Sequence, residues 1–219
     1  MVMRLKRREA MAAGTAFGLA ATGLLTGRVL AQDTAAETTT EGGAGPNVEP
    51  YVMGDADAPV HVIEYASLTC PHCATFHTDV LPRLREDYID TGKVRFEFRE
   101  VYFDRLGLWG GMLARCGGGM RYFGIVDLLL KRQPEWTRAS SGEEAIAVMR
   151  RIGLQAGLTE AQMDECLRDA ELAEALVARY QQHIEEHPIT GTPSFVIEGE
   201  LLSNMSYDAF RERLDAALG

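Results

Sequence analysis

The segment Cys70-Pro71-His72-Cys73 places two thiols directly after a short apolar run and directly before a pattern typical of a helix. A cysteine at a helix N-terminus meets unpaired N–H groups and the positive end of the helix dipole, which both favour the thiolate. We therefore expect Cys70 to be the reactive thiolate and Cys73, one turn further on, to be shielded and to close a disulfide with it. An imidazole at His72 would add a donor or a positive charge, and a stabilised thiolate makes the disulfide a stronger oxidant.

The same Cys-x-x-Cys spacing also occurs as half of a zinc site, and such a site needs further ligands. The other cysteines, Cys116 and Cys166, lie far apart in the sequence, and neither begins a second Cys-x-x-Cys. His77 is a candidate third ligand. We expect neither a metal nor a cofactor, and metal binding stays an alternative use of the pair.

The elements that hold the thiols form a strand, a helix and a second strand. Residues 60–66 are a β-rich run that we read as a buried strand. Residues 74–90 carry apolar side chains at helical spacing, with Pro82 as a kink. Residues 93–101 alternate as a strand does.

The middle of the chain is helical in pattern. It has five helical patterns, at residues 106–116, 120–131, 143–154, 160–169 and 172–186. Strand character returns only at residues 194–198 and near Leu201, before a closing helix that begins at Ser206. The order predicts an α/β fold in which a βαβ unit and a ββα unit are separated by a helical insertion.

Two segments resemble the DsbA family of thiol:disulfide oxidoreductases. Val62-Ile-Glu-Tyr-Ala-Ser-Leu-Thr-Cys-Pro-His-Cys73 resembles the strand and loop of its active site, and Gly191-Thr-Pro-Ser-Phe195 resembles its cis-proline loop. The likeness covers roughly residues 50–219. It implies a thioredoxin-like fold with an all-helical insertion, without a cofactor.

This resemblance sets the expected domains. Residues 50–104 and 188–219 would form the thioredoxin-like domain, and residues 105–187 the helical insertion. Residues 32–49 are polar and rich in Gly and Thr, and we expect them to be a disordered leader.

The resemblance also implies roles for Thr192 and Pro193. Pro193 would be cis and pack against the active-site disulfide, which turns the Thr192 backbone toward the sulfurs and lets it pair with a substrate segment as an added strand. A trans proline that begins a strand is the alternative. The best-known periplasmic oxidases of the family have Val before this proline, and Thr occurs in isomerase-like relatives. The Thr192 hydroxyl could bond a sulfur.

Glu64 interrupts an apolar strand six residues before Cys70. Burying a carboxylate is costly, so one kept beneath a dithiol suggests a proton acceptor for Cys73. A solvated Glu64 face of the strand is the alternative.

Cys116 and Cys166 both lie in the expected insertion. Exported cysteines seldom stay free, and four cysteines allow three pairings, of which 70 with 73 and 116 with 166 is the most economical. Some relatives in the family carry a second disulfide in the helical domain. Two buried free thiols are the alternative.

His183-Ile-Glu-Glu186-His187 matches the H-x-x-E-H pattern of one metalloprotease class. It falls in the last turn of a helical pattern, with Pro188 next, and we expect it to be a solvated helix end.

The first 31 residues read as a secretory signal, with a basic start, a mostly apolar run from Ala10 to Leu25 and a cleavage site after Ala31. Arg7-Arg8 leaves the Sec and twin-arginine routes both open. The run is shorter and more diluted than a membrane anchor, which is the alternative. Cleavage would remove five basic residues and Glu9, a net +4, and would change the formal charge of the chain from -10 to -14. We therefore expect no nucleic-acid partner.

The favoured function is a monomeric periplasmic oxidase that donates its Cys70–Cys73 disulfide to unfolded exported proteins. A membrane quinone reductase of the DsbB type would then reoxidise it. A disulfide isomerase or reductase on the same scaffold is the first alternative. The second is a periplasmic metal-binding protein.

Overall fold

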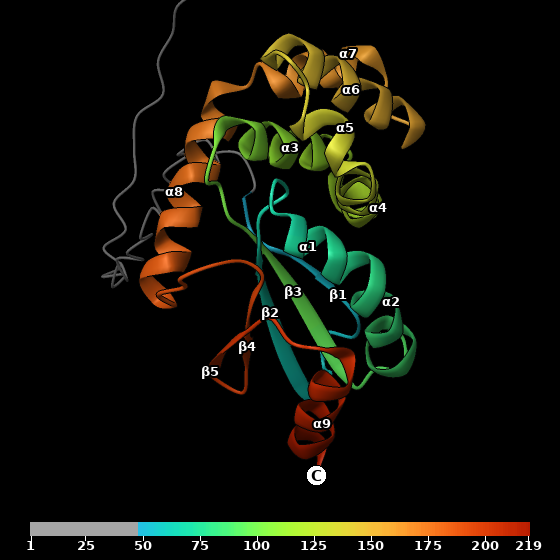
Figure 1. Cartoon of the computed structure of the whole chain (residues 1–219), viewed down its shortest axis with the longest axis vertical. Helices are drawn as coiled ribbons and strands as arrows, with labels where there is room; N and C mark the ends of the chain where they lie inside the picture. The colour runs from blue at the N-terminus through green and yellow to red at the C-terminus, as the bar shows by residue number, and fades with distance from the viewer. Residues whose placement is uncertain (1–47) are drawn as a thin grey trace, which may run out of the picture. The chain divides into compact units, whose positions relative to one another are not determined.

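A computed structural model describes residues 48–219, which are built around a five-stranded sheet (Figure 1). The strands are β1 (Tyr51–Met53), β2 (Val60–Ala66), β3 (Val94–Glu100), β4 (Ser194–Ile197) and β5 (Glu200–Ser203). Their order in the sheet is β1-β3-β2-β4-β5. Only the central pair, β2 and β3, is parallel, and each outer pairing is antiparallel.

The central strand β2 is buried on both faces because helices cover each side of it. Its alternate side chains point to opposite faces. Val60 and Val62 pack in one apolar cluster, whereas Ile63 and Tyr65 pack in another. Glu64 has the same parity as Val60 and Val62, and therefore points to the face covered by the helix that follows Cys70.

That helix continues from Pro71 to Ile89 in four segments. They are α1 (Pro71–Thr75), η1 (Phe76–Val80), α2 (Leu81–Leu84) and η2 (Arg85–Ile89), of which η1 and η2 are π-helical. The π-helical segment η1 directly precedes the turn that holds Pro82, whose missing N–H cannot contribute to the regular hydrogen-bond ladder. The C-terminal helix α9 (Tyr207–Leu218) packs on the same face of the sheet.

Between β3 and β4 the chain is helical. The helices are α3 (Arg105–Cys116), α4 (Gly118–Lys131), α5 (Gln133–Thr137), α6 (Gly142–Gln155), α7 (Glu160–Leu167) and α8 (Ala170–Glu186). The last of them, α8, returns along the sheet, where Tyr180 packs with Ile63 and Tyr65.

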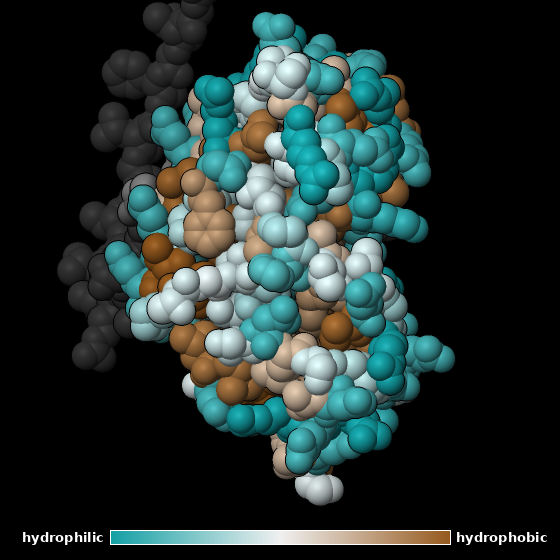
Figure 2. All heavy atoms as spheres, viewed as in Figure 1, coloured by the Kyte–Doolittle hydropathy of each residue, from teal (hydrophilic) through white to brown (hydrophobic). Residues whose placement is uncertain are grey.

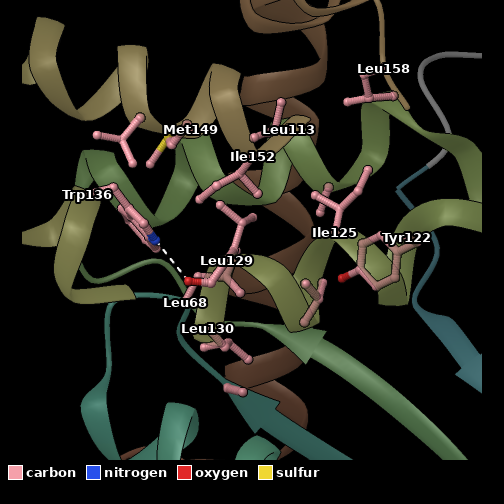
Figure 3. Close-up of a cluster of buried hydrophobic side chains, with 14 of the residues drawn as sticks. Leu68, Leu113, Tyr122, Ile125, Leu129, Leu130, Trp136, Met149, Ile152 and Leu158 are labelled. Atoms are coloured by element: carbon pink, nitrogen blue, oxygen red, sulfur yellow. Dashed lines mark hydrogen bonds between the residues drawn. The ribbon is translucent and has the colours of Figure 1, made fainter. Parts of the chain in front are cut away.

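The helical insertion has its own core, into which the active-site loop reaches. Figure 3 shows Leu68, from the loop after β2, among side chains of the insertion. Trp136 is fully buried there and donates its indole N–H to the Leu129 carbonyl at 2.9 Å. Gly110 on α3 allows the close approach, since a Cβ there would lie 3.0 Å from the Leu68 side chain. The loop that ends in Cys70 is thus anchored in the insertion.

The α/β class with a helical insertion, expected from the sequence, is confirmed. Two short elements were missed in that analysis, β1 and α5. β1 has three residues and α5 has five, which is too short for a periodic pattern to stand out. Within residues 48–219, no helix has the length and apolar character needed to cross a membrane. The expected signal at residues 1–31 and nearly all of the expected leader lie outside the described residues.

Candidate active site

Cys70 is the N-cap residue of α1, with extended backbone angles, and Pro71 occupies the first turn. Proline suits this position because its missing N–H would have no partner in the helix. Cys70 is half-buried, and its thiol donates to the backbone carbonyl of Thr192 at 3.2 Å. The end of β2 thus places the sulfur at the start of a helix and beside the loop that precedes β4.

The surroundings of Cys70 favour its thiolate. A hydrogen bond from the Cys73 thiol, the Thr192 side chain, and the backbone N–H groups of Cys73 and His72 together lower the pKa of Cys70 to about 5, against the opposing effect of burial. The Thr192 hydroxyl is buried and has no hydrogen-bond partner while Cys70 is a thiol. It can therefore donate a hydrogen bond to the sulfur once Cys70 is a thiolate.

Cys73 has the opposite environment. Its side chain is fully buried, and both cysteines are free thiols in the structure. Burial, the hydrogen bond to Cys70 and the charge of Glu64 raise the pKa of Cys73 well above its ordinary value. Of the two thiols, only Cys70 is suited to attack an outside disulfide at neutral pH.

The loop before β4 completes the site. The Thr192–Pro193 peptide bond is cis, and β4 pairs antiparallel with β2, with Ser194 opposite Tyr65. This pairing brings a segment more than 120 residues away in sequence to the Cys70 sulfur. The sequence alternative of a trans proline is wrong.

Glu64 lies beneath the thiols and is fully buried, so the alternative of a solvated carboxylate is wrong. Its Oε2 lies 2.9 Å from Nε2 of His77, while its Oε1 has no hydrogen-bond partner. Burial lowers the pKa of His77, but the carboxylates of Glu64 and Asp127 outweigh this effect and raise it to about 9. His77, considered from the sequence only as a metal ligand, is therefore the cationic partner of Glu64.

Comparison with known proteins agrees with this geometry. A family model described as thioredoxin matches residues 46–216. The chain belongs to the thioredoxin family.

Individual members resemble it over most of its length. A putative protein-disulfide oxidoreductase of Rickettsia bellii is 33% identical over 168 residues, which is 76% of this chain and 64% of that protein. A probable disulfide bond formation protein D of Bacillus anthracis is 28% identical, over 76% of this chain and 77% of that protein. This thioredoxin-family chain thus spans somewhat less than two thirds of the Rickettsia relative.

Among solved structures, Wolbachia pipientis alpha-DsbA1 aligns with a TM-score of 0.73 at 28% identity, covering 80% of this chain and 94% of that one. The resemblance to DsbA proteins that the sequence motifs indicated is confirmed.

His72 contributes less than its sequence position suggested. Its side chain is exposed and, among residues 48–219, makes no hydrogen bond or ion pair. What supports the Cys70 thiolate is the backbone N–H of residue 72.

The sequence analysis missed the residues that hold the active-site loop from the helical insertion. Gln133 on α5 is buried and donates its side-chain amide to the carbonyls of Leu68 and Cys70, at 2.8 and 2.9 Å. Thr69 donates to the carboxylate of Asp104, the N-cap residue of α3, at 2.8 Å. No local pattern marks Gln133, because its partners are 65 and 63 positions away.

The H-x-x-E-H segment is a solvated helix end only in part, because Glu185 and Glu186 are exposed whereas the two histidines are buried or half-buried. His183 is buried, and burial together with Arg99 and Arg179 lowers its pKa to about 4. His187 lies 2.8 Å from the Tyr65 hydroxyl, and Glu186 pairs with Arg99 at 2.6 Å. These side chains fix α8 to the sheet. In the part of the chain from 48 to 219, no group of His, Cys, Asp and Glu is arranged to hold a metal.

The remaining two cysteines are joined. Cys116, the last residue of α3, and Cys166, near the end of α7, form a disulfide with a sequence separation of 50. The structure does not bring this pair to Cys70 and Cys73. Its sulfurs link two helices of the insertion.

Proposed function

We propose that this protein is a periplasmic thiol:disulfide oxidoreductase that introduces disulfide bonds into unfolded exported proteins. The observation that carries the proposal is the asymmetry of the two thiols. Cys70 is accessible and has a pKa of about 5, whereas Cys73 is buried and has a raised pKa. Stabilising the Cys70 thiolate stabilises the reduced form, so the disulfide form is a strong oxidant.

The reaction follows from these positions. A substrate thiolate attacks Cys70 Sγ, the Cys70–Cys73 bond breaks, and Cys73 leaves with the electron pair and takes up a proton. A second substrate thiolate then attacks the substrate sulfur of the mixed disulfide and releases the Cys70 thiolate. In the proposal, Glu64 exchanges the Cys73 proton, and the backbone of Thr192 holds the substrate segment beside Pro193.

An unfolded substrate needs apolar surface next to the sulfur. Phe103 is 60% exposed and immediately precedes Asp104, which binds the residue before Cys70. In Figure 2, hydrophobic residues in brown lie in patches among hydrophilic residues in teal, one of them over the region of β4 and β5. These patches favour a protein substrate over a small molecule.

The rest of the cycle belongs to the same proposal. The signal read at residues 1–31 would export the chain by the Sec or the twin-arginine route, and the mature protein would act as a monomer. A strong oxidant is poorly reoxidised by glutathione-like couples, so we propose a membrane quinone reductase of the DsbB type as the reoxidant.

The test compares two activities of the purified protein. The oxidised form should oxidise a reduced, unfolded substrate protein. This oxidation should be faster than the repair of a substrate with scrambled disulfides by the same enzyme. The equilibrium of the Cys70–Cys73 pair with glutathione should favour the reduced dithiol. A Cys73→Ala variant should retain exported proteins as mixed disulfides on Cys70, and Cys70→Ala/Cys73→Ala should retain none. Faster repair than oxidation would replace the oxidase with an isomerase, for which Thr192 is the residue to examine.

A further inference from the structure

Cys73 and Glu64 are both fully buried, so a proton that leaves Cys73 still has to reach solvent. The reaction releases this proton each time the disulfide is restored. The side chains around Glu64 define where it can go.

One oxygen of Glu64 is already engaged. Its Oε2 lies 2.9 Å from Nε2 of His77. His77 is itself buried, and its other nitrogen, Nδ1, has no hydrogen-bond partner. The imidazole thus has one nitrogen on the buried carboxylate and one nitrogen free for an exchange.

The free nitrogen faces α4. Nδ1 of His77 lies 3.6 Å from Oδ1 of Asp127, whose side chain is 47% exposed. A small movement of this half-exposed carboxylate, or one water molecule between the two groups, closes such a gap. Two surface cavities, of about 240 and 310 Å³, are both lined by His77, Pro82 and Asp127. Solvent therefore reaches Asp127 and the Nδ1 side of His77.

The other charged groups at this end are on the surface. They are Arg85, Glu86, Asp90 and Lys131. Arg85 lies 4.0 Å from Asp127. Within residues 48–219, none of the four makes a hydrogen bond or ion pair with Glu64, which is linked to this surface through His77.

We propose that His77 and Asp127 form a proton relay that connects Glu64 and Cys73 to solvent. This inference rests on the proposed dithiol exchange and adds the route of its proton. An imidazolium suits the task because one N–H can bond Glu64 while the other N–H releases its proton on the opposite side. The raised pKa of His77 agrees with this arrangement, since the ring is held between two carboxylates.

The relay acts when Cys73 resolves a mixed disulfide between Cys70 and an outside thiol. Cys73 gives its proton to Glu64, and its sulfur then attacks Cys70 Sγ. The bond from Cys70 to the outside sulfur breaks, and that sulfur leaves as a thiolate with the electron pair. The neutral Glu64 no longer holds the imidazolium of His77 as an ion pair, so His77 releases its Nδ1 proton to Asp127 and to solvent and keeps its Nε2 proton on Glu64. One proton thus leaves for each disulfide that forms.

The two steps can be separated with the aromatic disulfide 5,5′-dithiobis(2-nitrobenzoate) and the reduced full-length mature protein. The first coloured thiolate is released when Cys70 attacks the reagent, and the second when Cys73 resolves the mixed disulfide. Cys73→Ala identifies the phases, because it should show only the first.

The variants remove the relay at two points. Asp127→Asn removes its surface end, and His77→Gln keeps a donor for Glu64 but cannot pass a proton on. Both should leave the first phase unchanged and slow the second by about 100-fold or more. Asp79→Asn is the matched control, since Asp79 is an exposed carboxylate on the same helical segment as His77, and it should keep both phases.

Rescue separates proton transfer from an effect of charge or folding. Formate, added at increasing concentration at fixed pH and ionic strength, should restore the second phase of Asp127→Asn and leave the wild type unchanged. A normal second phase in both variants, a slow one in Asp79→Asn, or no rescue would each overturn the relay. Absence of the first phase in the wild type would overturn the dithiol exchange itself, so the two failures are distinguishable.

Discussion

The two cysteine pairs of this protein sit at opposite ends of helices. Cys70 is the N-cap residue of α1, where backbone N–H groups are unpaired. Cys116 is the last residue of α3, and Cys166 precedes the last residue of α7. The helix dipole stabilises a thiolate at an N-terminus and opposes one at a C-terminus. The same residue type is thus prepared for exchange in one region and for a permanent bridge in the other.

Their surroundings extend the contrast. Cys70 meets a loop carbonyl from Thr192, and Cys73 lies above a buried carboxylate–imidazole pair. Cys116 packs against the large apolar core of the insertion, and Cys166 packs against the smaller cluster of Met112, Leu172 and Leu176. A reactive pair needs groups that manage charge and protons, and a structural pair needs only packing.

The largest effect should come from removing the attacking sulfur. Cys70→Ala should abolish disulfide exchange with a reduced protein substrate, because Cys73 is buried and holds its proton tightly. The measurement is the rate of oxidation of that substrate. Cys116→Ala/Cys166→Ala is the matched control and should exchange at close to the wild-type rate. If that control lost exchange as well, the separation of the two pairs would be wrong.

The second-largest effect is on stability, to which the Cys116–Cys166 pair should contribute and the Cys70–Cys73 disulfide should not. Cys116→Ala/Cys166→Ala should lower the free energy of unfolding by up to about 4 kcal/mol, because the bridge closes a loop of 50 residues in the unfolded chain. Denaturant or thermal unfolding measures it. Reducing the Cys70–Cys73 disulfide of the same variant should not destabilise it further, since the reduced site is the more stable form. A stability unchanged by loss of the bridge would contradict a structural role.

The third prediction concerns pH and uses the same Cys116→Ala/Cys166→Ala background, in which only one pair can be reduced. The pKa of Cys70 is about 5 in the folded dithiol form and near 9 ordinarily. A thiol whose pKa is depressed in the folded protein stabilises the folded state fully above its ordinary pKa. This stabilisation is lost as the pH falls to the pKa of the folded state. The unfolding midpoint of the reduced form minus that of the oxidised form should therefore rise from pH 5 toward pH 9.

His77 does not disturb that difference. Because the pKa of His77 is raised in the folded protein, its protonation stabilises the folded state below its ordinary pKa. This stabilisation is lost as the pH rises toward about 9. Glu64 and Asp127 face His77 whether or not the two thiols are joined, so we expect this contribution to cancel when the two midpoints are subtracted. If the difference between the two midpoints did not change between pH 5 and pH 9, the folded protein would not stabilise the Cys70 thiolate.

The smallest effect is expected at His72. His72→Ser should raise the pKa of Cys70 only slightly, because the backbone N–H that supports the thiolate is present with either side chain. Thiolate absorbance against pH measures this. Thr192→Val serves as the comparison, and should raise the pKa more by removing a buried hydroxyl beside the sulfur. A larger change for His72→Ser than for Thr192→Val would restore the imidazole to the role that its position suggested.

The sequence by itself determined the reactive pair and the scaffold. A strand pattern, Cys70-Pro71-His72-Cys73 and a helical pattern are contiguous, so local geometry alone puts the first sulfur at a helix N-terminus. The insertion was equally readable, because amphipathic helices of eight or more residues carry a strong periodic pattern.

Only the tertiary structure decided what surrounds the sulfurs. Glu64 is buried because helices cover both faces of β2, and its partner His77 is reached across the interface between sheet and helix. Gln133 and Asp127 come from helices of the insertion, and their partners lie dozens of residues away. Hydrogen bonds and proton routes of this kind depend on distances across packed elements, and sequence spacing within one element carries no record of them.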